Sequence, residues 1–174
     1  MSRLKKISRI SYFLVILFTL FFSRNALAAT ATTTFSVTAT VATVCSVSTV
    51  PALNFGTYNP TNGANDDATT NFTVTCTDTS PYNVGLDKGT TSGGTIAIRK
   101  MKDGPGTHTI DYTLYSDSAR SVVWGDVIGT NTVANTGTGV AQPYTVYGRI
   151  PIPQSNPTIP PTSYSDTITL TVTY

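Results

Sequence analysis

The chain has no glutamate and only one histidine, and charged residues make up only 11% of it. A histidine-based catalytic triad would have to use His108, which follows a Gly-Pro-Gly turn, and no strained serine turn accompanies it. One histidine and two cysteines are also too few ligands for a zinc site. We therefore expect no catalytic, metal-binding or cofactor-binding residues, and a protein that is not an enzyme.

All nine acidic residues are aspartates. A pair of carboxylates is enough for glycoside hydrolysis, so a secreted hydrolase stays open as an alternative. Four aspartates are nevertheless expected to form turns or to face solvent: Asp103, Asp111, Asp117 and Asp126. The polar segment 59–70 is expected to be a loop; its oxygen atoms could bind calcium, but their spacing is not that of an EF-hand.

The first 28 residues have the pattern of a secretory signal peptide. Four basic residues precede an apolar run at 12–22, and Ala26-Leu27-Ala28 follows as a small-x-small cleavage site. The apolar run is shorter than the roughly 20 residues that span a bilayer, although an uncleaved anchor remains the alternative. We expect export, and cleavage that leaves residues 29–174 as a single domain.

Removing this segment changes the sign of the net charge. Five of the eleven basic residues lie before Ala28, so residues 29–174 keep six basic and nine acidic side chains, a net charge of −3. A weakly acidic domain without a basic cluster is a poor partner for nucleic acid or for an anionic membrane surface.

The two cysteines, Cys45 and Cys76, both follow the signal. In an oxidising compartment they are expected to pair, which would stabilise the fold by about 3–4 kcal/mol in the chain-entropy description. Two free buried thiols are the alternative.

Apolar and polar residues alternate through most of the chain, and no segment after Ala28 has sustained helical periodicity. Short alternating segments joined by Gly-, Pro- and Asn-rich turns predict an all-β sandwich or barrel. The predicted strands include a half-buried one at 35–41, a further one at 95–101 and a last one at 167–174. Residues 129–142 are expected to be mobile. Trp124 and the tyrosines are expected to pack in the core, with a sugar-binding platform as the alternative.

The alternating segments occur in a particular order along the chain: Phe35-x-Val37-x-Ala39-x-Val41, Cys45–Val47, Leu53–Tyr58, Phe72–Cys76, Ile110–Arg120, Val123–Asp126, Tyr144–Ile150 and Tyr164–Val172 with a terminal Tyr174. This ordered set resembles the archaic chaperone–usher pilins, a family also described as the spore coat protein U domain. The resemblance covers nearly all of residues 29–174, and the proline-rich segment 152–161 departs from it.

The resemblance implies an immunoglobulin-like β-sandwich that lacks one strand, which a periplasmic chaperone and then a neighbouring subunit would supply in trans. The donor strand would be about residues 33–42, with Phe35, Val37, Ala39 and Val41 as inserted side chains. The acceptor groove and chaperone-docking strand would carry Ile168, Leu170, Val172 and Tyr174. The implied function is a surface pilus subunit, assembled through an outer-membrane usher and serving adhesion and biofilm formation.

Two other functions remain open for the same domain. One is a structural protein of a spore or cell coat. The other is a sugar-binding adhesin at the tip of a fibre.

Overall fold

The computed structural model describes residues 28–156 and 158–174, so nearly all of the predicted signal peptide lies outside the described residues. The chain divides into two units, Met1–Ala39 and Thr40–Tyr174. In the first unit the described residues, 28–39, are exposed and form neither helix nor strand. Within the described ranges, no helix has the length and apolar character needed to cross a membrane.

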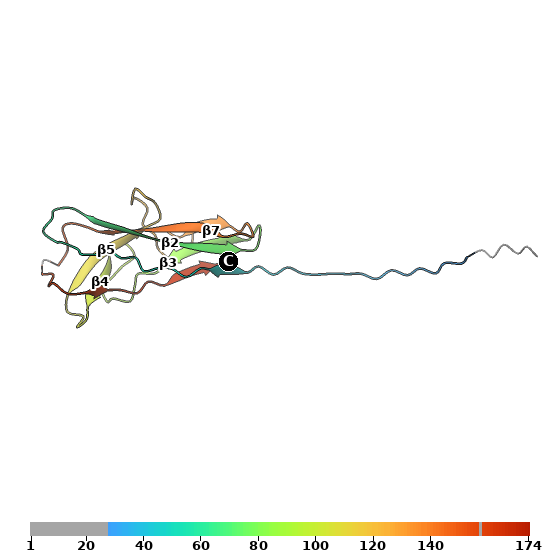
Figure 1. Ribbon diagram of the computed structural model, residues 1–174, viewed down its shortest axis with the longest axis horizontal. Helices are drawn as coiled ribbons and strands as arrows, with labels where there is room; N and C mark the ends of the chain where they lie inside the picture. Colours follow the sequence, from blue (N-terminus) through green and yellow to red (C-terminus); the bar gives the residue numbers. More distant parts are fainter. Residues whose placement is uncertain (1–27, 157) are drawn as a thin grey trace, which may run out of the picture. The chain divides into compact units, whose positions relative to one another are not determined.

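The second unit is built from strands, which confirms the all-β prediction (Figure 1). The described residues form nine of them: β1 (Cys45–Val47), β2 (Asp66–Cys76), β3 (Pro81–Leu86), β4 (Arg99–Asp103), β5 (Thr109–Tyr115), β6 (Val133–Thr136), β7 (Gln142–Ile150), β8 (Tyr164–Ser165) and β9 (Leu170–Thr173).

The strands form two antiparallel sheets, as expected for an immunoglobulin-like sandwich. One sheet has the order β1-β2-β7-β5-β4-β8, and the other has the order β6-β3-β9. The longest pairing joins β2 to β7, which lie next to each other in Figure 1. In the smaller sheet β9 pairs with β3 on one side and is the last strand on the other, so it has a free edge.

The core is formed by the inward residues of β2, β3, β5 and β7 together with Trp124. Their burial alternates along β7, for example, as the period-two pattern requires. Trp124 is 1% exposed, and its indole N–H donates to the Val84 carbonyl oxygen at 2.8 Å. The rings of Phe72 and Tyr144 stack with their centroids 5.3 Å apart. Trp124 and several tyrosines therefore pack in the core, as predicted.

Four boundaries differ from the sequence predictions. The last strand, predicted at 167–174, is shorter and is observed at Leu170–Thr173. For the other three, a partner strand explains the difference. The polar loop predicted at 59–70 is shorter, because Asp66 to Thr70 pair with β7 and begin β2. Part of the segment 129–142, predicted to be mobile, forms β6 against β3. The strand predicted at 95–101 is observed at Arg99–Asp103, where β5 offers backbone partners.

Two of the four aspartates predicted to form turns or to face solvent are buried. Asp103 does form a turn, since the Gly106 N–H donates to its carbonyl oxygen at 3.0 Å. Asp103 is 4% exposed and accepts hydrogen bonds from the backbone N–H groups of Thr107 and His108. The His108 side chain, 2.8 Å from the Asp103 carboxylate, is the main cause that lowers the pKa of Asp103 to about 2. Asp111 is also 4% exposed and is paired with Lys100. The turn prediction is thus confirmed for Asp103, whereas solvent exposure is wrong for both carboxylates, because the folded chain brings them hydrogen-bond partners.

A disulfide joins Cys45 on β1 to Cys76 on β2, where the two residues are direct cross-strand neighbours. β1 has only three residues and lies at the edge of its sheet. The disulfide therefore ties a short edge strand covalently to one of the longest strands of the sandwich.

The double variant Cys45→Ala/Cys76→Ala should unfold at lower urea concentration, with a loss of about 3–4 kcal/mol in the free energy of unfolding. Unfolding of both proteins is to be followed by tryptophan fluorescence with and without reductant. Reductant should lower the free energy of unfolding of the wild type to that of the variant and leave the stability of the variant unchanged. Equal stability of the two proteins without reductant would contradict this assignment.

Candidate functional site

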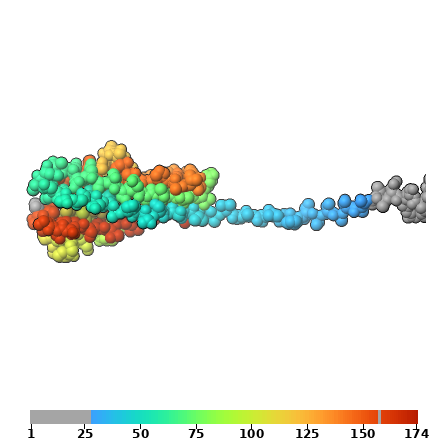
Figure 2. All heavy atoms as spheres, in the orientation of Figure 1, coloured from blue at the N-terminus to red at the C-terminus, as the bar shows by residue number. Residues whose placement is uncertain are grey.

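The second unit contains an open groove of about 1150 Å³ between two segments of the chain. We call residues 50–58 the first wall and residues 159–170 the second wall. Figure 2 shows atoms of the first wall in teal and atoms of the second wall in red on the same face of this unit. The floor is formed by buried side chains of the core: Leu86, Ile110, Tyr112, Leu114, Val146 and Ile150.

The first wall runs along the sandwich without belonging to a strand. Its start is held by the Thr70 hydroxyl, which donates to the Pro51 carbonyl oxygen at 2.7 Å. Beyond that, no backbone–backbone hydrogen bond joins residues 52–58 to any residue that the structure describes. Leu53 and Phe55 are half-buried against the core, so the segment is fixed by side-chain packing. Its backbone groups remain available apart from the Gly56 N–H, which donates to Asn54 Oδ1 at 2.8 Å.

The second wall is similar between β8 and β9. Residues 166–168 make no backbone–backbone hydrogen bond within the described part of the chain. Thr169 is held by Asp87, whose backbone N–H donates to the Thr169 carbonyl oxygen at 3.1 Å and whose carboxylate accepts from the Thr169 N–H at 3.0 Å. Both walls therefore present unpaired backbone groups, as the edges of a sheet do.

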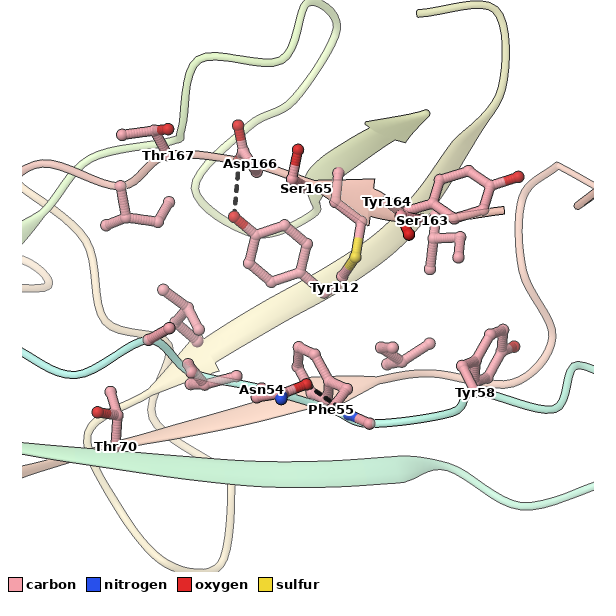
Figure 3. Close-up of a pocket in the computed structure, with 18 of the residues that line it drawn as sticks. Asn54, Phe55, Tyr58, Thr70, Tyr112, Ser163, Tyr164, Ser165, Asp166 and Thr167 are labelled. Carbon is pink, nitrogen blue, oxygen red and sulfur yellow. Dashed lines mark hydrogen bonds between the residues drawn. The ribbon is translucent and has the colours of Figure 1, made fainter. Parts of the chain in front are cut away.

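Asp166 is the charged group of the groove, and it accepts five hydrogen bonds. The hydroxyl of Tyr112, on the floor, donates to one carboxylate oxygen at 2.7 Å (Figure 3). The backbone N–H and hydroxyl groups of Thr90 and Thr91 donate to the other oxygen at 3.0–3.1 Å. These contacts anchor the second wall to the floor and to the loop that follows β3.

Burial alone would raise the pKa of Asp166, but the hydrogen bonds, with Tyr112 first among them, outweigh it and lower this pKa. Burial raises the pKa of the Tyr112 phenol, and the hydrogen bond to Asp166 adds to the shift. At neutral pH the pair is therefore a carboxylate and a neutral phenol, which makes the phenol the donor.

Tyr58, at the end of the first wall, has a buried hydroxyl without a hydrogen-bond partner among the described residues. Burial, with the nearby charge of Asp66 as a second cause, raises the pKa of this phenol. The surface that faces the groove is more apolar than polar, and Asp166 is the charged residue among those that line it. The groove thus suits an apolar occupant that also offers backbone hydrogen bonds.

The structure brings only part of the predicted acceptor strand to this groove. Ile168 and Leu170 line it. Val172 lies outside the lining, pairs with Val84 and packs against the core. Tyr174 is 59% exposed and also lies outside the lining.

Sequence analysis did not assign the first wall or the floor to a site. The sequence does contain a pattern that could have indicated the first wall: Leu53-Asn54-Phe55 alternates apolar, polar and apolar residues, as a short strand does. The floor residues Ile110, Tyr112 and Leu114 alternate on β5 and look like ordinary core residues in the sequence. Only the fold reveals that the core is open above them.

The segment predicted as a half-buried strand at 35–41 forms no strand in the structure, and its side chains are exposed. Phe35 is 86% exposed, Val37 is 85% exposed and Val41 is 81% exposed. The alternation is present in the sequence, but no described strand pairs with this segment. The prediction of a half-buried strand within this chain is therefore wrong, because burial requires a partner.

The described residues include no group of three or more His, Cys, Asp or Glu side chains placed to hold a metal ion. His108 lies on the hairpin between β4 and β5, where it is engaged by Asp103 and is not among the residues that line the groove.

The class of protein is thus an antiparallel β-sandwich domain with an open groove along one side. The chain belongs to the Spore Coat Protein U domain family, which matches residues 31–171. A curated relative is "Protein U" of Myxococcus xanthus, which is 35% identical over 131 residues, covering 70% of this chain and 71% of the relative.

A solved structure has a similar fold. It is the CsuC–CsuE chaperone–tip adhesion subunit pre-assembly complex from archaic chaperone-usher Csu pili of Acinetobacter baumannii. One chain of it matches with a TM-score of 0.54 and 22% identity over 78% of this chain. The present chain spans 40% of the length of that chain, and at this identity the likeness concerns the fold alone.

The variant Asp166→Ala removes the acceptor of Tyr112, Thr90 and Thr91, and it should lower the free energy of unfolding at pH 7 by about 1–3 kcal/mol. Because the pKa of Asp166 is lowered in the folded state, its contribution is present above the unfolded pKa of about 3.9 and is lost as pH falls through the folded value. Urea unfolding of both proteins at pH 7 and at pH 3 measures the contribution of Asp166 to the free energy of unfolding.

The stability difference between wild type and Asp166→Ala should therefore be larger at pH 7 than at pH 3. The exposed Asp126 provides the matched control, and Asp126→Ala should change stability little at either pH. A wild-type advantage over Asp166→Ala that is the same at both pH values would rule out the charged form as the source of the effect.

Proposed function

We propose that this protein is a structural subunit of a bacterial surface pilus assembled by donor-strand exchange. The observation that carries the proposal is the apolar groove between two walls whose backbone groups are unpaired. A β-strand inserted between the walls forms backbone hydrogen bonds to both of them and places alternate side chains on the floor. The role is structural rather than catalytic.

The occupant we assign to the groove of the assembled fibre is the segment of about residues 33–42 from a second copy of this chain. The segment has no charged residue and no proline, and Phe35, Val37, Ala39 and Val41 alternate with Ser and Thr. All four are exposed in the single chain. An extended segment with one apolar face matches a groove that has an apolar floor and polar backbone on both sides.

The energetics favour a long-lived joint. Full burial of a valine or phenylalanine side chain stabilises by roughly 1.5–3 kcal/mol, with less for alanine. Three such residues and one alanine would contribute several kcal/mol, in addition to the backbone pairing. Covering the floor also removes an exposed apolar surface and an open sheet edge, both of which promote aggregation.

Exchange of a segment from one copy into the groove of the next is head to tail and does not close on itself, so it builds a fibre. Before assembly the groove needs a temporary strand, which we assign to a periplasmic chaperone. Assembly would follow at an outer-membrane usher. The chaperone complex and the chaperone-usher pilus named for the Csu structure support these partners.

The remaining assignments follow from the same pathway. Residues 1–28 are a signal peptide, and residues 29–174 form one pilin domain that passes through the periplasm to the cell surface. Adhesion and biofilm formation are the roles we assign to the assembled pilus.

A second candidate function, a structural protein of a spore coat or cell coat, is favoured by the description of the matching family, the Spore Coat Protein U domain. Electron microscopy of cells with and without the gene distinguishes the two functions. Thin surface fibres that disappear with the gene support the pilus, whereas an altered coat without loss of fibres supports the second function.

Deleting residues 29–41 should abolish fibre growth, because the subunit keeps its groove but loses the strand that fills the next one. Moving the same segment to the C-terminus through a flexible Gly/Ser linker should let the domain fill its own groove. That variant should be a monomer with a higher melting temperature than the deletion variant. Electron microscopy, analytical ultracentrifugation and thermal unfolding measure these outcomes.

The control carries the transplanted segment with Val37→Asp, which places a charge on the apolar face and should abolish self-completion. Normal fibres from the deletion variant would overturn the proposal. So would a melting temperature that is the same with and without the transplanted segment.

Leu170→Asp should prevent assembly, because Leu170 lines the groove and a carboxylate there would be buried without a partner when a strand covers it. Thr171→Asp is the matched control, since the adjacent Thr171 is exposed on the opposite side of β9. The measurement is the amount of surface fibre and of periplasmic subunit by immunoblotting. If Leu170→Asp produces wild-type amounts of fibre, Leu170 does not contact the inserted strand.

A further inference from the structure

The first wall rests on a glycine at a position where the strand pattern calls for a core side chain. Along β7 the buried positions are Tyr144, Val146, Gly148 and Ile150. Three of them place a large side chain in the core, and the fourth has none. The backbone of Gly148 does not have the positive φ that favours glycine, so its conformation does not explain the residue. A glycine within a strand commonly marks the close approach of another segment.

The approaching segment is the first wall. A Cβ atom at position 148 would lie 2.9 Å from Leu53 Cδ2, 2.9 Å from Phe55 Cζ and 3.0 Å from Leu53 Cδ1. Cβ contacts below 3.0 Å are essentially never observed, so a side chain at 148 would force the ends of the Leu53 and Phe55 side chains to shift. Leu53 and Phe55 both line the groove, and so do Val146 and Ile150 on either side of Gly148. The missing side chain at 148 therefore determines how closely the Leu53 and Phe55 side chains pack on β7.

The position of Phe55 is coupled to the opposite wall. Its ring meets the Tyr112 ring edge to face, with centroids 6.4 Å apart and an interplanar angle of 64°. The Tyr112 hydroxyl donates to Asp166 at 2.7 Å. In Figure 3, Phe55 lies on one side of the groove, Asp166 lies on the other, and Tyr112 is between them. A continuous set of contacts thus crosses the floor from one wall to the other.

We propose that Gly148 is a specificity-determining position of the groove: by letting Leu53 and Phe55 sit close to β7, it sets the width of the groove and so the size of the side chains that an inserted strand can carry. This inference rests on the proposed function, since it concerns the strand that the groove accepts. Alanine at 148 displaces the ends of the Leu53 and Phe55 side chains, both of which line the groove, and so narrows the space left for an inserted strand. Gly148 acts through the wall and is a positioning residue.

The test compares peptides of different size on proteins with different wall positions. The full chain, exported and purified, is unfolded and refolded by dilution with an excess of synthetic peptide. The peptides have the sequence of residues 29–42, either unchanged or with Phe35, Val37 or Val41 replaced by alanine. Native mass spectrometry and competition between labelled peptides give relative affinities.

On the wild type, each truncated peptide should bind more weakly than the unchanged peptide, by about tenfold for Val37→Ala. On Gly148→Ala, the preference should reverse for at least one truncated peptide, because the narrowed groove accepts the smaller side chain better. Gly104→Ala is the matched control: a Cβ there meets no atom within 4 Å, and this variant should rank the peptides as the wild type does.

A second variant tests the opposite direction and does not depend on the folding of Gly148→Ala. Leu53→Ala removes a wall side chain above Gly148 and widens the groove, so a peptide with Val37→Phe or Val41→Phe should gain relative to the unchanged peptide. A role of Gly148 in stability alone would weaken all peptides by the same factor. That result, or an unchanged ranking on both variants, overturns the inference while leaving the proposed function in place. If the wild type binds no peptide, the proposed function fails, and the inference fails with it.

Discussion

The organisation of this domain depends on one unmet requirement, the pairing and covering of the groove between the two walls. Elsewhere in the sandwich the strands pair with neighbours, and the core side chains between the sheets are almost fully buried. At the groove, residues 52–58 and 166–168 have no backbone partners in the described part of the chain. Backbone groups at a sheet edge and an uncovered core are both costly, and the inserted strand that we propose would satisfy both needs.

Because the walls lack the ladder that normally holds a strand, side chains hold them instead. The second wall is anchored by Asp166 through Tyr112, Thr90 and Thr91, and by Asp87 through Thr169. The first wall is anchored through Leu53 and Phe55 over Gly148. The disulfide at Cys45 fixes the chain shortly before this wall begins. These contacts leave the backbone of both walls free while defining where it lies, which is the preorganisation that strand insertion requires.

Local periodicity is sufficient to predict the central strands of the sandwich. β2, β3, β5 and β7 alternate strongly, and their existence and inward faces follow from the period of two. Alternation does not name a partner, however. The same pattern at 35–41 gives exposed residues, because no described strand of the chain pairs with them. Conversely, the Gly-, Thr- and Asn-rich segment 129–142 contains a strand because β3 offers it an edge.

The sequence by itself determined the all-β class, the two cysteines, the aromatic core residues and a segment near the N-terminus with one apolar face. Each depends on residue type or on local periodicity. Only the tertiary structure decided that Leu53 and Phe55 form a wall, that Ile110, Tyr112 and Leu114 form the floor of a groove, and that Asp166 is satisfied by Tyr112. The physical reason is that a groove is a missing contact between segments about one hundred residues apart. A local sequence pattern cannot predict such a groove, because the groove is defined only when the surrounding segments have folded.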